Sequence, residues 1–374
     1  MFCGENSLLS NWYKTQWFTC KEHNMKYSAL GSSGESVSRV CLGSMTWGVQ
    51  NDQTEANQQI DYAISQGVNF IDTAELYPVP PSADTYGDTE RIIGNWLAQN
   101  KHKRQDLILA TKIAGAGLPY IRDASFISGK TVKQALDDSL SRLQTDHVDL
   151  YQLHWPNRTS PHFAKHWPNQ VVFSKLDKER ETAQMFEILQ ALGDCVKAGK
   201  IKHCGLSDDT TWGINQYLKL SEKHDLPKMV SIQNEFNLLH TKDWPYLMEN
   251  CIHEDIAFLP WSPLAGGVLS GKYLGGARPK GSRWSFSQRN GLFRDTPQTE
   301  QAVSAYVALA NEFGITPSQL ALAWCNQVDG VTSSIIGATS LAQLKENIDA
   351  FSITLTDEQM KQITGVMQAH PATF

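Results

Sequence analysis

The chain alternates short apolar runs with longer segments in which apolar residues return every three or four positions. Short runs rich in Val, Ile, Leu and Phe, bounded by polar or glycine residues, are typical of buried β-strands. We expect eight strands: RVCLG (39–43), NFIDT (69–73), LILAT (107–111), VDLYQL (148–153), IKHCGL (201–206), MVSIQ (229–233), IAFLP (256–260) and SSIIG (333–337).

The segments between these runs have the period of amphipathic helices. In residues 131–144, for example, Leu136, Leu140 and Leu143 fall on one face. Before the last strand, Gly314 ends one helix and Thr316-Pro317-Ser318 starts another, which predicts an extra helix pair. Helices are expected within residues 54–68, 131–144, 183–199, 308–324 and 341–351.

This alternation predicts an α/β fold with a parallel sheet covered by helices. Eight units point to a (β/α)8 TIM barrel with long loops at its C-terminal face. A doubly wound sheet is the competitor, but the first strand–helix junction reads LGSMTWGVQ and lacks the G-x-G-x-x-G of a dinucleotide-binding turn. Residues 25–38 are expected to form an N-terminal hairpin cap at the bottom of the barrel.

Composition adds limits to this picture. The 374 residues are 41% hydrophobic and carry a net charge of −6 without a block of like charges, which does not favour binding to a polyanion. Seven scattered cysteines without a C-x-x-C motif indicate reduced thiols in a cytoplasmic protein. Residues 1–24 lack periodicity and the features of a signal peptide, so we expect an extension there, followed by one barrel domain over 25–370.

Reactive side chains stand where the expected strands end, which is where barrel enzymes place their active sites. Asp72 and Tyr77 follow the second strand, Lys112 the third and His154 the fourth. Taken singly, each has a structural explanation: such a lysine extends to solvent, and a lone tyrosine packs in a core. Asp, Tyr, Lys and His at three consecutive strand ends indicate a catalytic group instead.

These four residue types suit carbonyl reduction. A phenol has a pKa of roughly 10, and a nearby ammonium lowers it. Tyr77 would then be the general acid, Lys112 the group that tunes it and Asp72 the anchor of Lys112. His154 would donate a hydrogen bond to the carbonyl oxygen as that oxygen gains negative charge.

Several stretches resemble those of the aldo-keto reductases: IDTAELY, LATKI, DLYQLHWP, GLS, IQNEF, WSPLAGGVLSGKY and IIGATSLAQLKEN. The stretches DTAE-x-YPVPP and HWP are most similar to a bacterial branch of that family, the Tas-type reductases. The resemblance runs from about Met25 to about His370. It implies a (β/α)8 barrel that binds NADP(H) in an extended pose, with Asp72, Tyr77, Lys112 and His154 as the catalytic tetrad.

The same resemblance implies where the cofactor lies. Trp261 would stack on the nicotinamide, while Ser207 and Gln233 would hold its carboxamide. Arg283 would lie near the ribose phosphate. The remaining residues implied in cofactor binding are Thr46, Asp208, Ser262, Leu264, Gly266, Lys272, Gly337, Thr339, Gln343, Glu346 and Asn347.

One residue departs from the family pattern. Ser-Asn usually follows the fifth strand, whereas this chain has Ser207-Asp208. Asparagine can donate a hydrogen bond to the carboxamide oxygen, but an ionised aspartate can only accept. Asp208 would accept from the carboxamide nitrogen or turn away, and we expect it to hold the cofactor more weakly than asparagine would.

The tetrapeptide His-Trp-Pro-Asn occurs at His154–Asn157 and again at His166–Asn169. The first copy ends a strand, whereas the second lies in a long polar loop, so His154 is the catalytic candidate. A zinc site formed by His154, His162 and His166 is the alternative, and we expect no metal. Trp47 and Trp155 stand close to strand ends, where they either line an apolar substrate pocket or pack in the core.

Together these features predict an NADPH-dependent reductase of small aldehydes or ketones that acts in the cytoplasm as a monomer or homo-oligomer, with no nucleic acid or membrane partner. One alternative is a regulatory protein on the same barrel that binds NADPH and turns over slowly, because channel β-subunits resemble this fold and keep the tetrad. The other is a metal-dependent hydrolase with Asp72 and His154 as ligands, which the lack of H-x-H in RVCLG disfavours.

Overall fold

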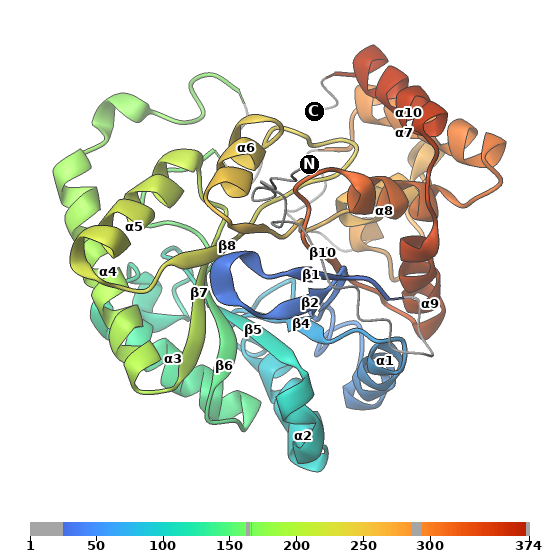
Figure 1. The fold of residues 1–374 in the computed structure, drawn as a ribbon. Coiled ribbons are helices and arrows are strands. Elements are labelled where there is room, and N and C mark those ends of the chain that lie inside the picture. Colours follow the sequence, from blue (N-terminus) through green and yellow to red (C-terminus); the bar gives the residue numbers. More distant parts are fainter. Residues whose placement is uncertain (1–24, 162–164, 166, 286–293, 372–374) are drawn as a thin grey trace, which may run out of the picture.

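Eight parallel strands form the central sheet of this protein, seen in a computed structural model that describes residues 25–161, 165, 167–285 and 294–371 (Figure 1). Their order is β10-β3-β4-β5-β6-β7-β8-β9, so neighbours in the chain are neighbours in the sheet. The strands are β3 (Val40–Gly43), β4 (Phe70–Asp72), β5 (Ile108–Ile113), β6 (Val148–Leu153), β7 (Ile201–Ser207), β8 (Met229–Gln233), β9 (Ala257–Phe258) and β10 (Ser334–Ile336). All eight expected strands are confirmed.

The sheet closes on itself beside β9. Phe258 bridges Val331 in parallel fashion, and the Thr332 amide donates to the Phe258 carbonyl at 2.9 Å. The Ile335 amide donates to the Pro260 carbonyl at 2.9 Å. These bonds join the last strand region to β9, so the fold is the expected (β/α)8 barrel and the doubly wound sheet is excluded.

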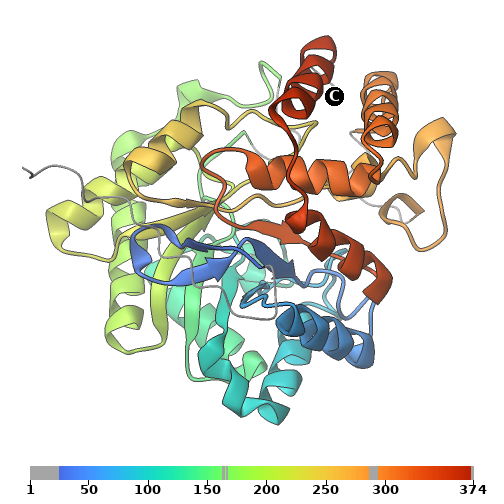
Figure 2. The same cartoon turned by 45° about the vertical axis from the view of Figure 1, so that its right-hand side comes forward.

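Helices surround the barrel, as the views in Figures 1 and 2 show. The extra pair α7 and α8 precedes β10, as expected, because Thr316 caps α8 and Pro317 occupies its first turn. The helices are α1 (Gln53–Ser65), α2 (Asp88–Gln99), α3 (Gly129–Leu143), α4 (Lys178–Lys197), α5 (Thr211–His224), α6 (Tyr246–His253), α7 (Pro297–Glu312), α8 (Pro317–Gln327), α9 (Leu341–Asp349) and α10 (Asp357–Ala369).

The expected N-terminal hairpin is present and covers the bottom of the barrel. Strand β1 (Tyr27–Ala29) pairs antiparallel with β2 (Ser36–Ser38). Between them, the Ser32 amide donates to the Asp255 carbonyl at 2.9 Å, just before β9 begins. Leu30 and Val37 are fully buried and pack against the inward-facing Phe70 and Leu150. The hairpin therefore acts as an apolar plug.

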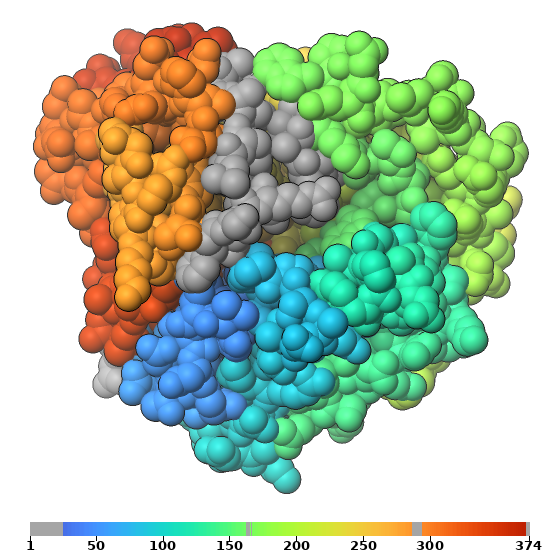
Figure 3. All heavy atoms as spheres, turned by 180° about the vertical axis from the view of Figure 1, so that it is seen from behind, coloured from blue at the N-terminus to red at the C-terminus, as the bar shows by residue number. Residues whose placement is uncertain are grey.

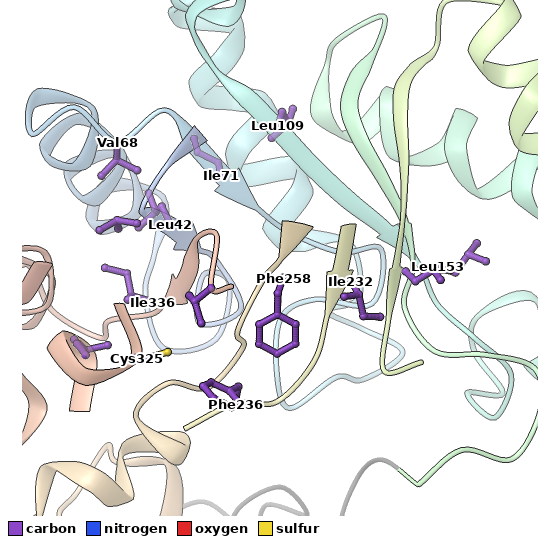
Figure 4. Packing of buried hydrophobic residues seen from close by; sticks show 14 of the residues in the cluster. Leu42, Val68, Ile71, Leu109, Leu153, Ile232, Phe236, Phe258, Cys325 and Ile336 are labelled. Atoms are coloured by element: carbon purple, nitrogen blue, oxygen red, sulfur yellow. The ribbon is translucent and has the colours of Figure 1, made fainter. Parts of the chain in front are cut away.

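The main hydrophobic core lies between the barrel wall and the helices. Outward-facing strand residues such as Leu42, Ile71 and Leu109 belong to it, and Figure 4 shows how they lie. Inward and outward positions alternate along each strand, which gives the barrel separate inner and outer apolar layers. None of the helices in the described ranges is long and apolar enough to cross a membrane.

Candidate active site

The four expected catalytic residues come together at the C-terminal ends of three adjacent strands. Asp72 is the last residue of β4, Lys112 lies near the end of β5, and His154 follows β6 directly. Parallel pairing aligns Asp72 with Ala110 and Lys112 with Gln152. Because neighbouring strands end at one rim, their side chains meet there. Figure 3 shows the face of the molecule on which the loops after these strands lie.

Lys112 and Asp72 form a buried ion pair. Lys112 Nζ lies 2.6 Å from Asp72 Oδ2 and donates to the Thr73 carbonyl at 2.8 Å. The Lys112 side chain is fully buried, and its pKa reflects opposing effects. Burial lowers that pKa, but the charges of Asp72 and Tyr77 raise it, and the net shift is upward. Lys112 therefore remains an ammonium at neutral pH.

Tyr77 and His154 lie next to this ion pair. Lys112 Nζ is 5.1 Å from the centre of the Tyr77 ring, and the Tyr77 and His154 ring centres are 5.6 Å apart at 80°. Burial raises the pKa of Tyr77 while the Lys112 charge lowers it, and the net shift is upward. The expected net lowering is therefore not found, because burial outweighs the ammonium. The phenol stays protonated at neutral pH.

His154 is held in its neutral form. It is only 8% exposed, and burial together with the Lys112 charge lowers its pKa well below the ordinary value of 6.5. Its Nδ1 is buried and has no hydrogen-bond partner among the described residues. A neutral imidazole can donate one hydrogen bond, which is what polarising a carbonyl oxygen requires.

Tyr77 also belongs to an apolar group, here called the mouth cluster. It consists of the buried Leu76, Ala114 and Ile121, with Tyr77, Val79, Tyr86, Leu118, Tyr120 and Trp155 packed against them. The Trp155 indole lies so close to Gly115 that a Cβ there would fall 2.0 Å from Trp155 Nε1. Trp155 is thus placed beside His154, at 5.0 Å between ring centres, where an apolar substrate would be received.

Sequence reasoning missed most of the mouth cluster, the polar residues Gln152 and Arg158, and the bond from Gln233 to Asp72. Gln152 and Gln233 both donate to Asp72 Oδ1, at 3.1 and 3.0 Å, and Arg158 forms an ion pair with Asp209. The available signal for Gln152 was a polar residue at an inward position of the apolar strand VDLYQL. The cluster residues lie in the segments that follow β4, β5 and β6, and nothing in their spacing distinguishes them from other loop residues.

Three of the expected nicotinamide residues occupy the ends of β7 and β8. Ser207 is 2% exposed. Gln233 directs its amide nitrogen to Asp72 and Gln152, so its carbonyl oxygen is the group left to accept from a ligand. Asp208 has a left-handed backbone with φ of 49°.

Asp208 is bonded to Trp261, the fourth of these residues. Trp261 Nε1 donates to Asp208 Oδ1 at 3.1 Å. Burial raises the pKa of Asp208 well above the ordinary aspartate range, although the Trp261 bond lowers it. The carboxyl neither turns to solvent nor leaves the rim, since it is 2% exposed and holds the indole beside β7.

The segment after β9 brings two cations to a glycine turn. Gly266 and Gly267 have φ of 68° and 93° within the 3-10 turn Ala265–Ser270. A Cβ at Gly267 would lie 2.9 Å from Lys272 Nζ, and one at Gly266 would lie 3.4 Å from Arg283 Nη1. Burial lowers the pKa of Arg283, and the nearby Tyr273 and Tyr77 raise it. Ser262 and Leu264 lie in the same segment, which therefore has the charge and the exposed backbone that a pyrophosphate needs.

Five of the remaining residues implied in cofactor binding lie around the start of α9: Gly337, Thr339, Gln343, Glu346 and Asn347. Ser340 caps this helix by accepting from the Gln343 amide, while Gln343 Oε1 accepts from Thr339 at 3.0 Å. Asn347 is buried and donates to the Gly337 carbonyl at 3.2 Å. Thr46 donates to the Ala338 carbonyl at 3.3 Å. Glu346 accepts from the Thr316 hydroxyl at the start of α8, at 2.6 Å.

Two further expectations concern Trp47 and a metal. Trp47 is fully buried in the main core and its indole donates to Gln59, so it packs in the core and does not line the opening. His162 and His166 lie outside the described residues. Asp72 accepts from Lys112, Gln152 and Gln233, so its oxygens are already engaged. Among the described residues no group of three or more His, Cys, Asp or Glu side chains is arranged as a metal site.

Comparison with known proteins agrees with this architecture. The family model described as "Aldo/keto reductase family" matches residues 39–368, and the chain belongs to that family. It is 40% identical over 349 residues to the Escherichia coli protein named "Protein tas", covering 92% of this chain and 99% of that one. It is 31% identical over 348 residues to "Uncharacterized oxidoreductase YrpG" of Bacillus subtilis, covering 91% and 96% of the two chains.

A relative with a different printed role is "Probable voltage-gated potassium channel subunit beta" of Arabidopsis thaliana. It is 30% identical over 354 residues, covering 93% of this chain and 98% of that protein. The family and its oxidoreductase-named members identify the class of this protein as an oxidoreductase of the aldo-keto reductase type.

Proposed function

We propose that the protein reduces the carbonyl group of small aldehydes or ketones with NADPH, and that Tyr77 is the general acid. The observation that carries this proposal is the buried Lys112–Asp72 pair next to Tyr77, with the neutral His154 at 5.6 Å from the Tyr77 ring. A protonated phenol and a neutral imidazole side by side offer two hydrogen-bond donors to one carbonyl oxygen.

Each residue of the tetrad has a distinct part in this proposal. Tyr77 donates its proton to the oxygen as negative charge develops there. The Lys112 ammonium, 5.1 Å from the phenol ring, stabilises the phenolate that remains. Asp72 fixes Lys112 in place and keeps it charged, and Gln152 and Gln233 orient Asp72 in turn. His154 donates to the same oxygen and fixes the side from which the carbonyl approaches.

The residues at the ends of β7 to β10 fit a nicotinamide cofactor. Bound NADPH would supply the hydride. Trp261 and Ser207 offer a flat ring and a hydroxyl close to the tetrad, and Lys272 and Arg283 offer positive charge at the glycine turn of Gly266 and Gly267. Two cations in one segment favour a cofactor with an additional phosphate, and we therefore expect NADPH to be preferred over NADH.

The mouth cluster supports an apolar substrate. Trp155, Leu118 and Tyr120 belong to the loops on the open side of Tyr77 and give this wall an aromatic and aliphatic surface. Such a wall receives an aromatic or aliphatic aldehyde by burying its apolar part while the carbonyl oxygen reaches Tyr77 and His154.

The direct test is the oxidation of NADPH by the purified protein in the presence of a reactive aromatic aldehyde. We expect turnover that requires the aldehyde and is unchanged by EDTA, because no step uses a metal. Binding of NADPH without turnover would favour the alternative of a regulatory protein, in keeping with the name of the Arabidopsis relative. Loss of activity in EDTA would contradict the proposed chemistry.

A further inference from the structure

Asp208 places a buried carboxyl group at the reacting end of the site. It follows β7, is 2% exposed and accepts a hydrogen bond from Trp261 Nε1 at 3.1 Å. Its backbone amide donates to the Gln233 carbonyl at 3.0 Å, which fixes it against β8. A residue with φ of 49° held by two such bonds has little freedom to move away when a ligand arrives.

The charge of Asp208 acts on Tyr77 and Lys112, two residues of the proposed reaction. A negative Asp208 raises the pKa of Tyr77, and the Lys112 charge acts on Asp208 in return. The other groups that act on it are the carboxyls of Glu235 and Asp243, which disfavour its charged form. Glu235 is paired with Arg294, while Asp243 accepts from Asn234 at 2.8 Å.

The two redox states of a nicotinamide differ in charge at this place. The reduced ring is neutral, and loss of a hydride from it leaves a ring with one positive charge. In a buried site, an ionised aspartate attracts such a positive ring more strongly than it does in water. Asparagine carries no charge and does not distinguish the positive ring from the neutral ring in this way.

Building on the proposed function, we propose that Asp208 makes the protein discriminate between the two redox states of its cofactor, binding NADP+ more tightly relative to NADPH than an asparagine at this position would. The carboxyl must be ionised for this effect. Because burial raises its pKa, the discrimination is small at low pH, where Asp208 is protonated, and grows as the pH rises through that raised pKa.

The test compares dissociation constants for NADPH and NADP+, measured by calorimetry from about pH 6 to about pH 9. The ratio of the two constants cancels the titration of the phosphate groups, which both forms share. The variants are Asp208→Asn and, as a matched control, Asp243→Asn, which neutralises a neighbouring carboxyl whose pKa burial raises to about 6. Asparagine tolerates the left-handed backbone at residue 208.

In the wild type, we expect the ratio of the NADPH constant to the NADP+ constant to increase by about tenfold across this range. In Asp208→Asn the ratio should be lower and nearly independent of pH, with tighter binding of NADPH. Asp243→Asn should keep the rise with pH and move it to lower pH, because the Asp243 carboxyl disfavours the charged form of Asp208.

Three results would contradict this inference. In one, the ratio of the NADPH constant to the NADP+ constant is the same in Asp208→Asn as in the wild type, even if both ligands bind more weakly. Asp208 would then only position Trp261. An equal effect of Asp243→Asn would assign the discrimination to the general charge of the region. If the wild type binds neither form, the proposed function itself is contradicted, and the inference falls with it.

Discussion

Lys112 is a fully buried cation whose charge is satisfied by Asp72 at 2.6 Å. Burying such a pair is costly unless every remaining hydrogen-bonding position is also used. Here the Thr73 carbonyl accepts from Lys112, and two glutamines donate to the second oxygen of Asp72. The pair therefore keeps a fixed positive charge beside the Tyr77 phenol.

The pKa shifts of His154 and Tyr77 predict a broad pH plateau for hydride transfer. The pKa of His154 is well below 6.5 and that of Tyr77 is above 10.0, so both groups hold the required form between these values. In Asp208→Asn, where residue 208 cannot titrate, the single-turnover rate of protein preloaded with NADPH should be flat over this interval. It should fall when the pH rises through the pKa of Tyr77, because the acid is then lost.

Asp208→Asn is the suitable background because an ionised Asp208 would favour the positive nicotinamide ring that hydride transfer forms, and single turnover excludes cofactor release. A rate that changes near pH 6.5 in this variant, but not when His154→Gln is added, would show that His154 titrates in the ordinary range. That result would contradict the neutral imidazole described above.

Among individual residues, the sequence predicted the catalytic tetrad but not the hydrogen bonds that hold it in place. Strand ends locate Asp72, Lys112 and His154 because the barrel brings those ends to one rim. The hydrogen bonds of Gln152 depend on strand register, which no spacing in the sequence reveals. Closeness to a strand end likewise left two roles open for Trp47, because it does not say which way a side chain turns, and the structure places Trp47 in the core.

Among the elements, the N-terminal hairpin depends on one glycine for its close approach to the barrel. Gly31 has φ of 53°, and a Cβ there would lie 2.3 Å from the Val230 carbonyl oxygen and 2.7 Å from that of Asp255. Both are backbone atoms, which cannot move aside as a side chain would.

Gly31→Ala should therefore lower the free energy of unfolding by about 2–4 kcal/mol, combining overpacking with left-handed strain. Gly34→Ala is the matched control, because Gly34 also has a positive φ, 81°, but has open space around it. It should cost about 1 kcal/mol. Urea unfolding measures both, and equal losses would mean that the hairpin does not press on the barrel as described.

Periodicity predicted several of the long helices but missed others, α2, α5 and α10, and it also missed the short α6. The expected helices at 131–144 and 183–199 correspond to α3 and α4, where capping by Ser128 and Asp177 reinforces a regular apolar face. Helix α6 has only eight residues and lacks a capping side chain, so its apolar pattern is too short to predict a helix. Strand β9 retains two of the five expected residues, Ala257 and Phe258.

For the whole molecule, the critical feature is the seam between β9 and the segment before β10. The Phe258 amide donates to Thr332 Oγ1 at 3.2 Å, and the Thr332 amide donates to the Phe258 carbonyl at 2.9 Å. A side-chain hydroxyl thus completes the ladder where β9 is too short to do so alone. The alternation of elements predicts a barrel, but this closure by a threonine side chain has no sequence signature.

Thr332→Val keeps the shape of the side chain and removes the acceptor for the buried Phe258 amide. We expect a loss of about 1–3 kcal/mol in the free energy of unfolding. Thr364→Val is the control, since the Thr364 hydroxyl is exposed and only bonds back to the Met360 carbonyl within α10. Its effect should stay within about 0.5 kcal/mol. If urea unfolding gave similar losses in the free energy of unfolding for both variants, the closure of the barrel would not depend on Thr332.

In the proposed reaction, Tyr77 protonates the carbonyl oxygen. The most direct test compares wild type with Tyr77→Phe in the oxidation of NADPH with an aromatic aldehyde. The variant keeps the ring beside Lys112 and His154 and loses only the hydroxyl. We predict that kcat falls by about 10²-fold or more while the dissociation constant for NADPH is unchanged. A Tyr77→Phe protein that reduces the aldehyde at the wild-type rate would contradict the account.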